Sequence, residues 1–251
     1  MEEIFEFIQN TADASSRFLV RASYLQIYNE VISDLLKPER TNLSVREDKK
    51  KGVFVEGLSE WVVRSPKEVY GLIKRGSAIR ATGSTRMNEL SSRSHALFII
   101  IVEQNEIIME AGGENSSTEE NTNEEGFRSS FKVGKLNLVD LAGSERVRIS
   151  GATGRRLEES KKINQSLSAL GNVIAALTDR ASRSHIPYRD SKLTRILEDS
   201  LGGNCKTTIC ACISPSMLHY DESYSTLLFA IKAMSVRTRV MMNERVEVKR
   251  D

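Results

Sequence analysis

Two short polar segments, each beside a strongly apolar stretch, contain residue types that can handle phosphate and Mg²⁺. The segment NELSSRSH (88–95) precedes ALFIIIV, and the segment DLAGSE (140–145) follows KLNLV. The hydroxyl groups of Ser91 and Ser92 could bind Mg²⁺ and a phosphate oxygen, and the Asp140 carboxylate could bind Mg²⁺ directly or through water. In an α/β sheet, the carboxyl end of a strand is also where ligands bind. The two segments therefore predict a phosphate-binding site.

Three further residues would let such a site respond to a nucleotide. Gly143 has no side chain, so its main-chain N–H could approach a phosphate closely. Arg93 and Glu145 carry opposite charges on the two loops, and they could form a bidentate pair only when both loops close on a nucleotide. Taken singly, these features have simpler explanations, namely a turn aspartate before a glycine and a solvated arginine. In combination the two motifs favour a nucleotide switch over a polar turn.

Apolar periodicity predicts the elements that would position these loops. Alternating or continuous apolar runs predict strands at 17–29, 42–48, 52–58, 60–65, 95–104, 132–140 and 206–214. Helices are predicted at 2–10, at 65–79, from about 157 to 177, within 185–201 and at 222–234. The second of these has a clear start, with Ser65 as N-cap, Pro66 at the first position and Glu68 completing a capping box. Interspersed strands and helices without a repeat indicate a layered α/β domain.

Composition and charge limit the class of protein. The 251 residues are 39% hydrophobic and 28% charged, which is typical of a soluble globular chain. No apolar run approaches the roughly 20 residues of a membrane span, and no signal peptide opens the sequence. The three cysteines lie in the predicted strand at 206–214 or just before it, and we expect reduced thiols in the core. The net charge is +2, but 103–125 holds eight acidic and no basic residues, so the remainder is basic and favours an acidic partner.

Several segments together resemble the motor domain of the kinesins. They are NELSSRSH, VDLAGSE, SYLQIYNEVISDLL, INQSLSALGNVIAAL and HIPYRDSKLTRILEDSLGGNCKT. The resemblance runs from about Arg17 to Ser235. It implies an α/β fold of the kinesin type, a three-layer α/β/α P-loop NTPase fold around a central mixed sheet. Residues 1–235 would be a partial motor domain with an acidic flexible loop at about 111–130, and 236–251 would be a neck-linker-like tail.

The resemblance also implies roles in binding and hydrolysing ATP. Ser92 and Asp140 would bind Mg²⁺, Asp140 directly or through water. The residues implied in nucleotide binding are Asn88, Ser91, Ser92, Asp140 and Gly143. Those implied in catalysis are Ser91, Ser92, Arg93, Gly143 and Glu145. The helix starting near Leu157 would be the relay helix, where Asn164 would support the second loop.

A basic surface would bind microtubules, whose surface is acidic. The residues implied are Arg146, Lys161, Lys162, Arg183, Arg189, Lys192 and Arg195. An ordinary charged helix face is the alternative explanation for this cluster. The expected location is the cytoplasm and the microtubule cytoskeleton, with no nucleic-acid partner and no membrane insertion. Dimerisation is not encoded in these residues, because the tail after Arg239 is too short for a coiled coil of several heptads.

One part of the family pattern is missing from the sequence. No G-x-x-x-x-G-K-[ST] phosphate cradle is present, and the stretch Gly202–Thr207 has no glycine directly before its lysine. We therefore expect a truncated isoform, shortened gene product or fragment, with weak ATP binding and unpaired edges on two apolar strands. The readings that remain are a kinesin motor piece, a non-motor microtubule binder or regulator, and another switch ATPase.

Overall fold

A long antiparallel sheet forms the centre of the computed structural model, which describes residues 1–13, 15–48, 52–82, 90–109, 127–144, 155–179 and 185–249. Its strands run in the order β2 (Val31–Asp34), β1 (Ser16–Tyr28), β6 (His95–Met109), β7 (Phe127–Asp140) and β8 (Glu244–Lys249), with β5 (Trp61–Val62) also paired to β1. A separate hairpin is formed by β3 (Ser44–Asp48) and β4 (Gly52–Glu56). Every strand pairing in the described part of the chain is antiparallel, so the expected mixed sheet is not found there.

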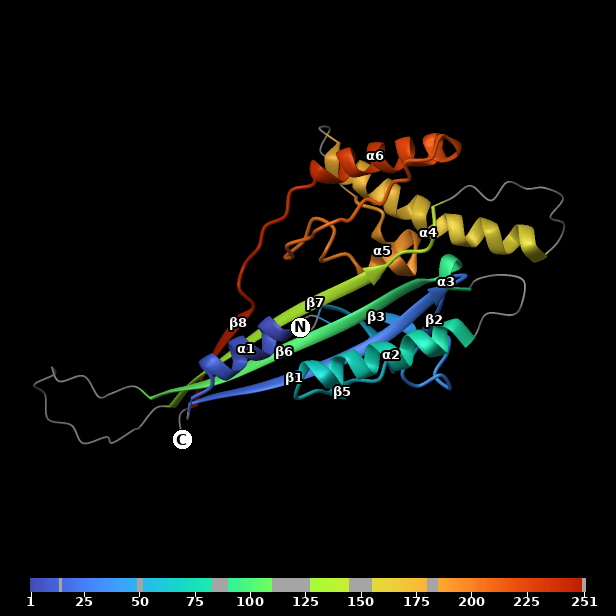
Figure 1. Cartoon of the computed structure of the whole chain (residues 1–251). Coiled ribbons are helices and arrows are strands. Elements are labelled where there is room, and N and C mark those ends of the chain that lie inside the picture. The colour runs from blue at the N-terminus through green and yellow to red at the C-terminus, as the bar shows by residue number, and fades with distance from the viewer. Residues whose placement is uncertain are drawn as a thin grey trace, which may run out of the picture.

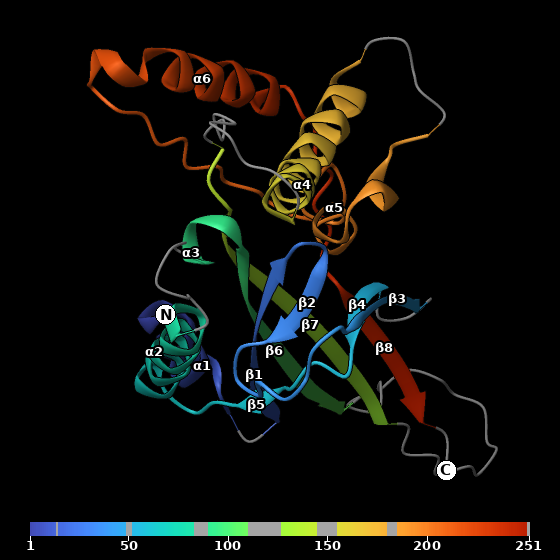
Figure 2. The same ribbon diagram turned by 90° about the vertical axis from the view of Figure 1, so that its right-hand side faces the viewer.

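Helices cover both faces of this sheet (Figures 1 and 2). One face packs against α1 (Glu2–Thr11) and α2 (Pro66–Thr82), and the other against α4 (Arg155–Thr178) and α5 (Lys192–Ile196). The helix α6 (Tyr220–Met234) lies beside α4, where Phe229 and Ala233 pack against the apolar core that the sheet forms with α4 and α5. Three short helices complete the set: α3 (Leu90–Arg93), η1 (Tyr188–Asp190) and η2 (Met217–His219). No helix among the described residues is long and apolar enough to cross a membrane.

The apolar run that starts β6 is buried on both faces, as its sequence predicts. Ala96, Phe98 and Ile100 belong to the core beneath α1 and α2, whereas Leu97 and Ile99 belong to the core beneath α4 and α5. Successive side chains of a strand point to opposite faces, so a continuous apolar run serves two cores at once. This arrangement confirms the expected three layers.

The start of α2 follows the predicted capping pattern with one difference. The main-chain N–H of Glu68 donates to the Ser65 hydroxyl at 3.3 Å, as in a capping box. The Glu68 carboxylate, however, accepts from the N–H of Arg64 at 2.9 Å, one residue before the cap. The first bond satisfies a donor that the helix start leaves unpaired, and the second fixes the residue that leads into the cap.

The predicted strand at 206–214 is wrong, because this segment has no strand or helix in the structure. Cys210 and Cys212 are exposed rather than buried in a core. Ile209 and Ile213 are also exposed. An apolar alternation stabilises a strand only when a neighbouring strand accepts its main-chain bonds, and among the described residues this segment has no such neighbour.

Two boundaries at the other edge of the sheet also differ from expectation. Residues 127–130, placed in the flexible acidic loop, are the first residues of β7, while 110–126 lie outside the described residues. Within the tail, Glu244–Lys249 forms β8 and pairs with the first half of β7, from Lys132 back to Phe127. The last part of the tail is therefore a strand of the sheet.

Candidate nucleotide-switch site and basic face

The two polar loops lie at the same end of neighbouring strands. The end of β7 at Asp140 is paired with Ala96, the second residue of β6, so the residues before β6 and after β7 meet at this edge. The short helix α3 carries Ser91, Ser92 and Arg93 into the site. The main-chain N–H of Gly143 donates to the carbonyl oxygen of Ser92 at 2.9 Å. The structure thus joins the two motifs directly through their backbones.

A buried arginine of α2 holds both loops in place. The guanidinium of Arg80 forms an ion pair with the Asp140 carboxylate at 2.6 Å. It also donates to the carbonyl oxygens of Ser91 at 2.7 Å and of Ser94 at 2.6 Å, and to the Ser94 hydroxyl at 3.1 Å. The planar guanidinium presents several donors in a fixed geometry, which suits this set of contacts. Arg80 therefore fixes the position of Asp140 relative to the loop before β6.

His95 connects the loop after β7, which contains Ala142 and Gly143, to the helix α4. Its Nδ1 accepts the main-chain N–H of Ala142 at 3.0 Å, and its Nε2 lies 2.7 Å from the Ser166 hydroxyl. Because Nδ1 is an acceptor, the neutral ring carries its proton on Nε2, which donates to Ser166. Burial, and to a smaller extent the nearby Arg80 charge, lower the pKa of His95 to about 4, and the Asp140 charge opposes them in part. The imidazole is therefore neutral at physiological pH.

The structure brings some of the predicted site residues together and leaves others outside the described residues. The residues that gather where β6 begins and β7 ends are Ser91, Ser92, Arg93, Asp140 and Gly143. Asn88 and Glu145 lie outside the described residues, so the expected pair between Arg93 and Glu145 stays a prediction. The backbone of Asn164 lies in α4, but its side chain is not described.

The donor set at this edge fits Mg²⁺ and phosphate. Mg²⁺ is commonly held by one or two carboxylates together with phosphate oxygens and water. The Asp140 side chain is 72% exposed despite its pair with Arg80, and the Ser92 hydroxyl belongs to the adjoining helix. Among the described residues, no group of three or more His, Cys, Asp or Glu side chains is placed to hold a metal without such a ligand.

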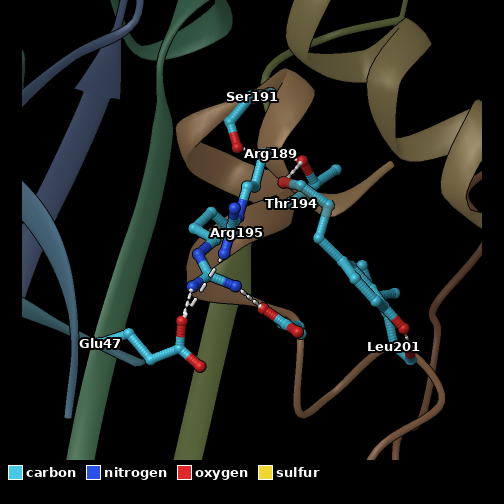
Figure 3. A network of polar contacts seen from close by, with 8 residues as sticks. Glu47, Arg189, Ser191, Thr194, Arg195 and Leu201 are labelled. Carbon is cyan, nitrogen blue, oxygen red and sulfur yellow. Dashed lines mark hydrogen bonds and ion pairs between the residues drawn. The ribbon is translucent and has the colours of Figure 1, made fainter. Parts of the chain in front are cut away.

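Three of the basic residues predicted to bind microtubules, Arg189, Lys192 and Arg195, have described side chains and lie on η1 and α5, near Glu47 of β3 (Figure 3). Arg189 is 77% exposed and reaches Glu47 at 3.9 Å. Arg195 is only 15% exposed and forms ion pairs with Glu47 and Glu198. Lys192 lies with Arg46, Arg189 and Arg195 around an open pocket of about 390 Å³. Arg195 therefore anchors this segment, whereas Arg189 remains available to a partner.

Four other predicted basic residues cannot be placed in this way. Arg146 and Arg183 lie outside the described residues, and Lys161 and Lys162 have described backbone in α4 but no described side chain.

Arg80 and Ser166 are site residues that sequence reasoning missed, and His95 was given no role of its own. Nothing in the sequence around Arg80 distinguishes it from the other basic residues of its helix, since its burial depends on contacts 11 to 60 residues away. His95 offered a weak signal, because a polar ring begins an otherwise apolar strand.

Comparisons with known proteins agree with this geometry. The kinesin motor domain family matches residues 1–236. A kinesin heavy chain of Neurospora crassa is 49% identical over 243 residues, which are 97% of this chain and 24% of the relative. Kinesin-related protein 3 of Dictyostelium discoideum is 46% identical over 97% of this chain and 19% of its own length. The chain thus spans about a quarter or less of these relatives.

Solved structures give the same result for the fold. A fast kinesin superposes with a TM-score of 0.81 at 48% identity, covering 97% of this chain and 63% of the other. A KIF14 dimer with AMP-PNP in complex with a microtubule superposes with a TM-score of 0.79 at 35% identity, covering 96% of this chain and 65% of the other. The family match over nearly the whole chain, together with the meeting of the two loops below α4, shows that this chain belongs to the kinesin motor-domain family.

Proposed function

We propose that the chain is the switch and microtubule-binding part of a kinesin-type motor. The reaction would be hydrolysis of ATP to ADP and phosphate, coupled to movement along microtubules in the cytoplasm. The observation that carries this proposal is the continuous set of contacts from the Ser92 carbonyl through Gly143, Ala142 and His95 to Ser166 on α4. A change in the loops is thereby linked to a helix beside the basic face.

The geometry suggests how the loops would respond to a nucleotide. Gly143 has one main-chain N–H, and it cannot serve both the Ser92 carbonyl and a phosphate oxygen. Phosphate binding would therefore compete with the bond between the loops, and the exchange would shift both loops. Mg²⁺ held by Asp140 and Ser92 would neutralise charge on the phosphates. Arg80 would keep the Asp140 carboxylate aimed at that position.

The remaining roles rest on the family. Ser91 and Ser92 would position the phosphate and the attacking water, and Arg93 would pair with Glu145 in the closed state. Asn164 would support the second loop from α4. The proposed microtubule contacts are Arg146, Lys161, Lys162, Arg183, Arg189, Lys192 and Arg195. Exposed cations of this kind would make binding strongly sensitive to salt.

A second function, microtubule binding without ATP turnover, is favoured by one sequence observation. The 251 residues contain no G-x-x-x-x-G-K-[ST] segment, whose backbone and lysine would hold the β- and γ-phosphates. The chain by itself would then bind ATP weakly, while its basic face would still bind microtubules.

Phosphate release separates the two functions. The purified chain would be incubated with Mg-ATP at low salt, with and without microtubules, beside the variants Glu145→Ala and, as a control on the exposed side of α1, Glu3→Ala. Turnover that microtubules stimulate and that only Glu145→Ala abolishes supports the motor function. Co-sedimentation with microtubules without phosphate release supports the passive binder. Failure of both turnover and co-sedimentation contradicts both.

A further inference from the structure

The turn between β1 and β2 carries a residue type that its backbone disfavours. Tyr28 pairs with Val31, so Asn29 and Glu30 form a two-residue hairpin loop. Both have positive φ angles, 54° and 60°, as in a type I′ turn. Asn is well suited to the first of these positions, but the second strongly prefers Gly, because a side chain in the left-handed region is strained. A glutamate here needs an explanation outside the hairpin.

Glu30 uses both oxygens of its carboxylate on the start of α5. The Ser191 hydroxyl donates to Oε1 at 2.9 Å, and the main-chain N–H of Lys192 donates to Oε2 at 2.8 Å. The same Ser191 hydroxyl accepts the N–H of Leu193 at 3.1 Å and so caps the helix. Ser191 and Leu193 are buried. Glu30 therefore holds the N-cap residue, which in turn holds the first turn of α5.

A second anchor, from a different hairpin, fixes the same segment. Arg195 at the end of α5 pairs with Glu47 of β3, and the Thr194 hydroxyl donates to the Tyr188 carbonyl at 2.7 Å (Figure 3). These contacts join η1 to α5 and so fix Arg189 and the backbone of Lys192 relative to each other. Two acidic residues from separate hairpins thus determine where the basic face lies relative to the sheet.

We propose that Glu30 is a positioning residue for the microtubule-binding face, acting through Ser191 and Lys192. This inference rests on the proposed microtubule binding. If only its charge mattered, Glu30 would weaken microtubule binding, because an acidic residue beside a basic face reduces the attraction to an acidic partner. Removal of the Glu30 charge should therefore tighten binding if only electrostatics matters, and weaken it if Glu30 positions the cations.

The test compares three variants of the whole chain in microtubule co-sedimentation at low salt. Glu30→Gln keeps one acceptor and removes the charge, and Glu30→Gly removes the cap while giving the turn its preferred residue. Both should weaken binding by roughly three- to tenfold, as expected for loss of one charged helix cap. Asp190→Asn, which removes an exposed charge of η1 and leaves the cap intact, should bind as tightly as the unmodified chain or more tightly.

Hydrogen exchange of the unbound variants completes the test. In Glu30→Gly the amides of Lys192, Leu193 and Thr194 should exchange faster, whereas those of β1 and β6 should not change. Binding of Glu30→Gln that equals or exceeds that of the unmodified chain overturns the proposal. If the unmodified chain fails to bind microtubules, the proposed function fails, and unchanged exchange at 192–194 would then overturn the positioning role separately.

Discussion

His95 illustrates how one residue at the site can be assigned a protonation state from its neighbours. The main-chain N–H of Ala142 donates to Nδ1, and the Nε2–H donates a hydrogen bond to the Ser166 hydroxyl oxygen. A second proton would have to displace the Ala142 bond inside a buried cluster that already contains the Arg80 charge. The bond between the second loop and α4 therefore depends on an uncharged ring.

This arrangement predicts a pH dependence of stability. The pKa of His95 is about 4 in the folded chain and about 6.5 in the unfolded chain, so between these values the unfolded state binds the extra proton. The contribution is fully present above about pH 6.5 and falls by on the order of 2–3 kcal/mol as the pH drops towards 4. Urea unfolding at several pH values measures it.

The variant His95→Gln removes this titration while retaining an amide donor. Its free energy of unfolding should be lower at pH 7 but should change less between pH 6.5 and 4. A pH profile identical to that of the unmodified chain would contradict the assignment.

At the scale of elements, the sequence predicts most of the helices and strands but not those that depend on a neighbour. Local signals suffice for α2, where Ser65 and Glu68 cap the helix, and for β6, whose apolar run is buried on both sides. The segment 206–214 has an equally good strand pattern but no partner among the described residues. Apolar alternation shows that a segment is able to form a strand, but the strand forms only where a neighbouring strand pairs with it.

The same limit applies to the site. The segments at 88–95 and 140–145 could be selected from sequence because their residue types can bind phosphate and Mg²⁺, and the structure brings their described residues together. The Arg80 and Ser166 contacts were not, since they join residues from separate helices and depend on the tertiary fold.

The second half of β7, Gly134–Asp140, has an exposed edge. β8 pairs only with Phe127–Lys132, and along Gly134–Asp140 no described strand lies on the side opposite β6. Leu136 and Leu138, on one face of this stretch, are 39% and 41% exposed. Unpaired apolar edges promote association between chains.

We therefore expect the isolated chain to self-associate through this edge at micromolar concentrations. The substitution Leu138→Lys should raise the monomer fraction severalfold, because a charge opposes strand pairing. Phe7→Lys, which removes an exposed apolar residue from α1, is the matched control and should have little effect. Sedimentation velocity measures the monomer fraction of both variants. Equal effects of the two substitutions would contradict the prediction and indicate nonspecific hydrophobic association.

For the whole molecule, burial divides the chain into parts of unequal stability. β1 and β6 lie between two cores, and Leu25, Ile27, Leu97 and Ile100 are almost completely buried. In contrast, α6 has no buried residue, and 206–214 is exposed apart from one half-buried serine. Regions with few buried apolar contacts open at lower free energy than the core.

Native-state hydrogen exchange should reveal this division directly. Amides of α6 should exchange by a partial opening that leaves β1 and β6 protected, with exchange rates at least about tenfold faster than those of β6. The measurement uses the intact chain below its unfolding transition. Equal protection of α6 and β6 would show that the molecule unfolds in one step.

The pairing of β6 with β7 has a practical consequence for labelling. Fourteen paired positions, from Ala96 opposite Asp140 to Met109 opposite Phe127, separate the far end of this strand pair from the candidate site. At about 3.4 Å per residue the separation is roughly 45 Å. A fluorescent domain inserted between 110 and 126 would thus be attached at the end of the strand pair that lies away from the candidate site. The strand pair would therefore hold a reporter at a distance from the candidate site.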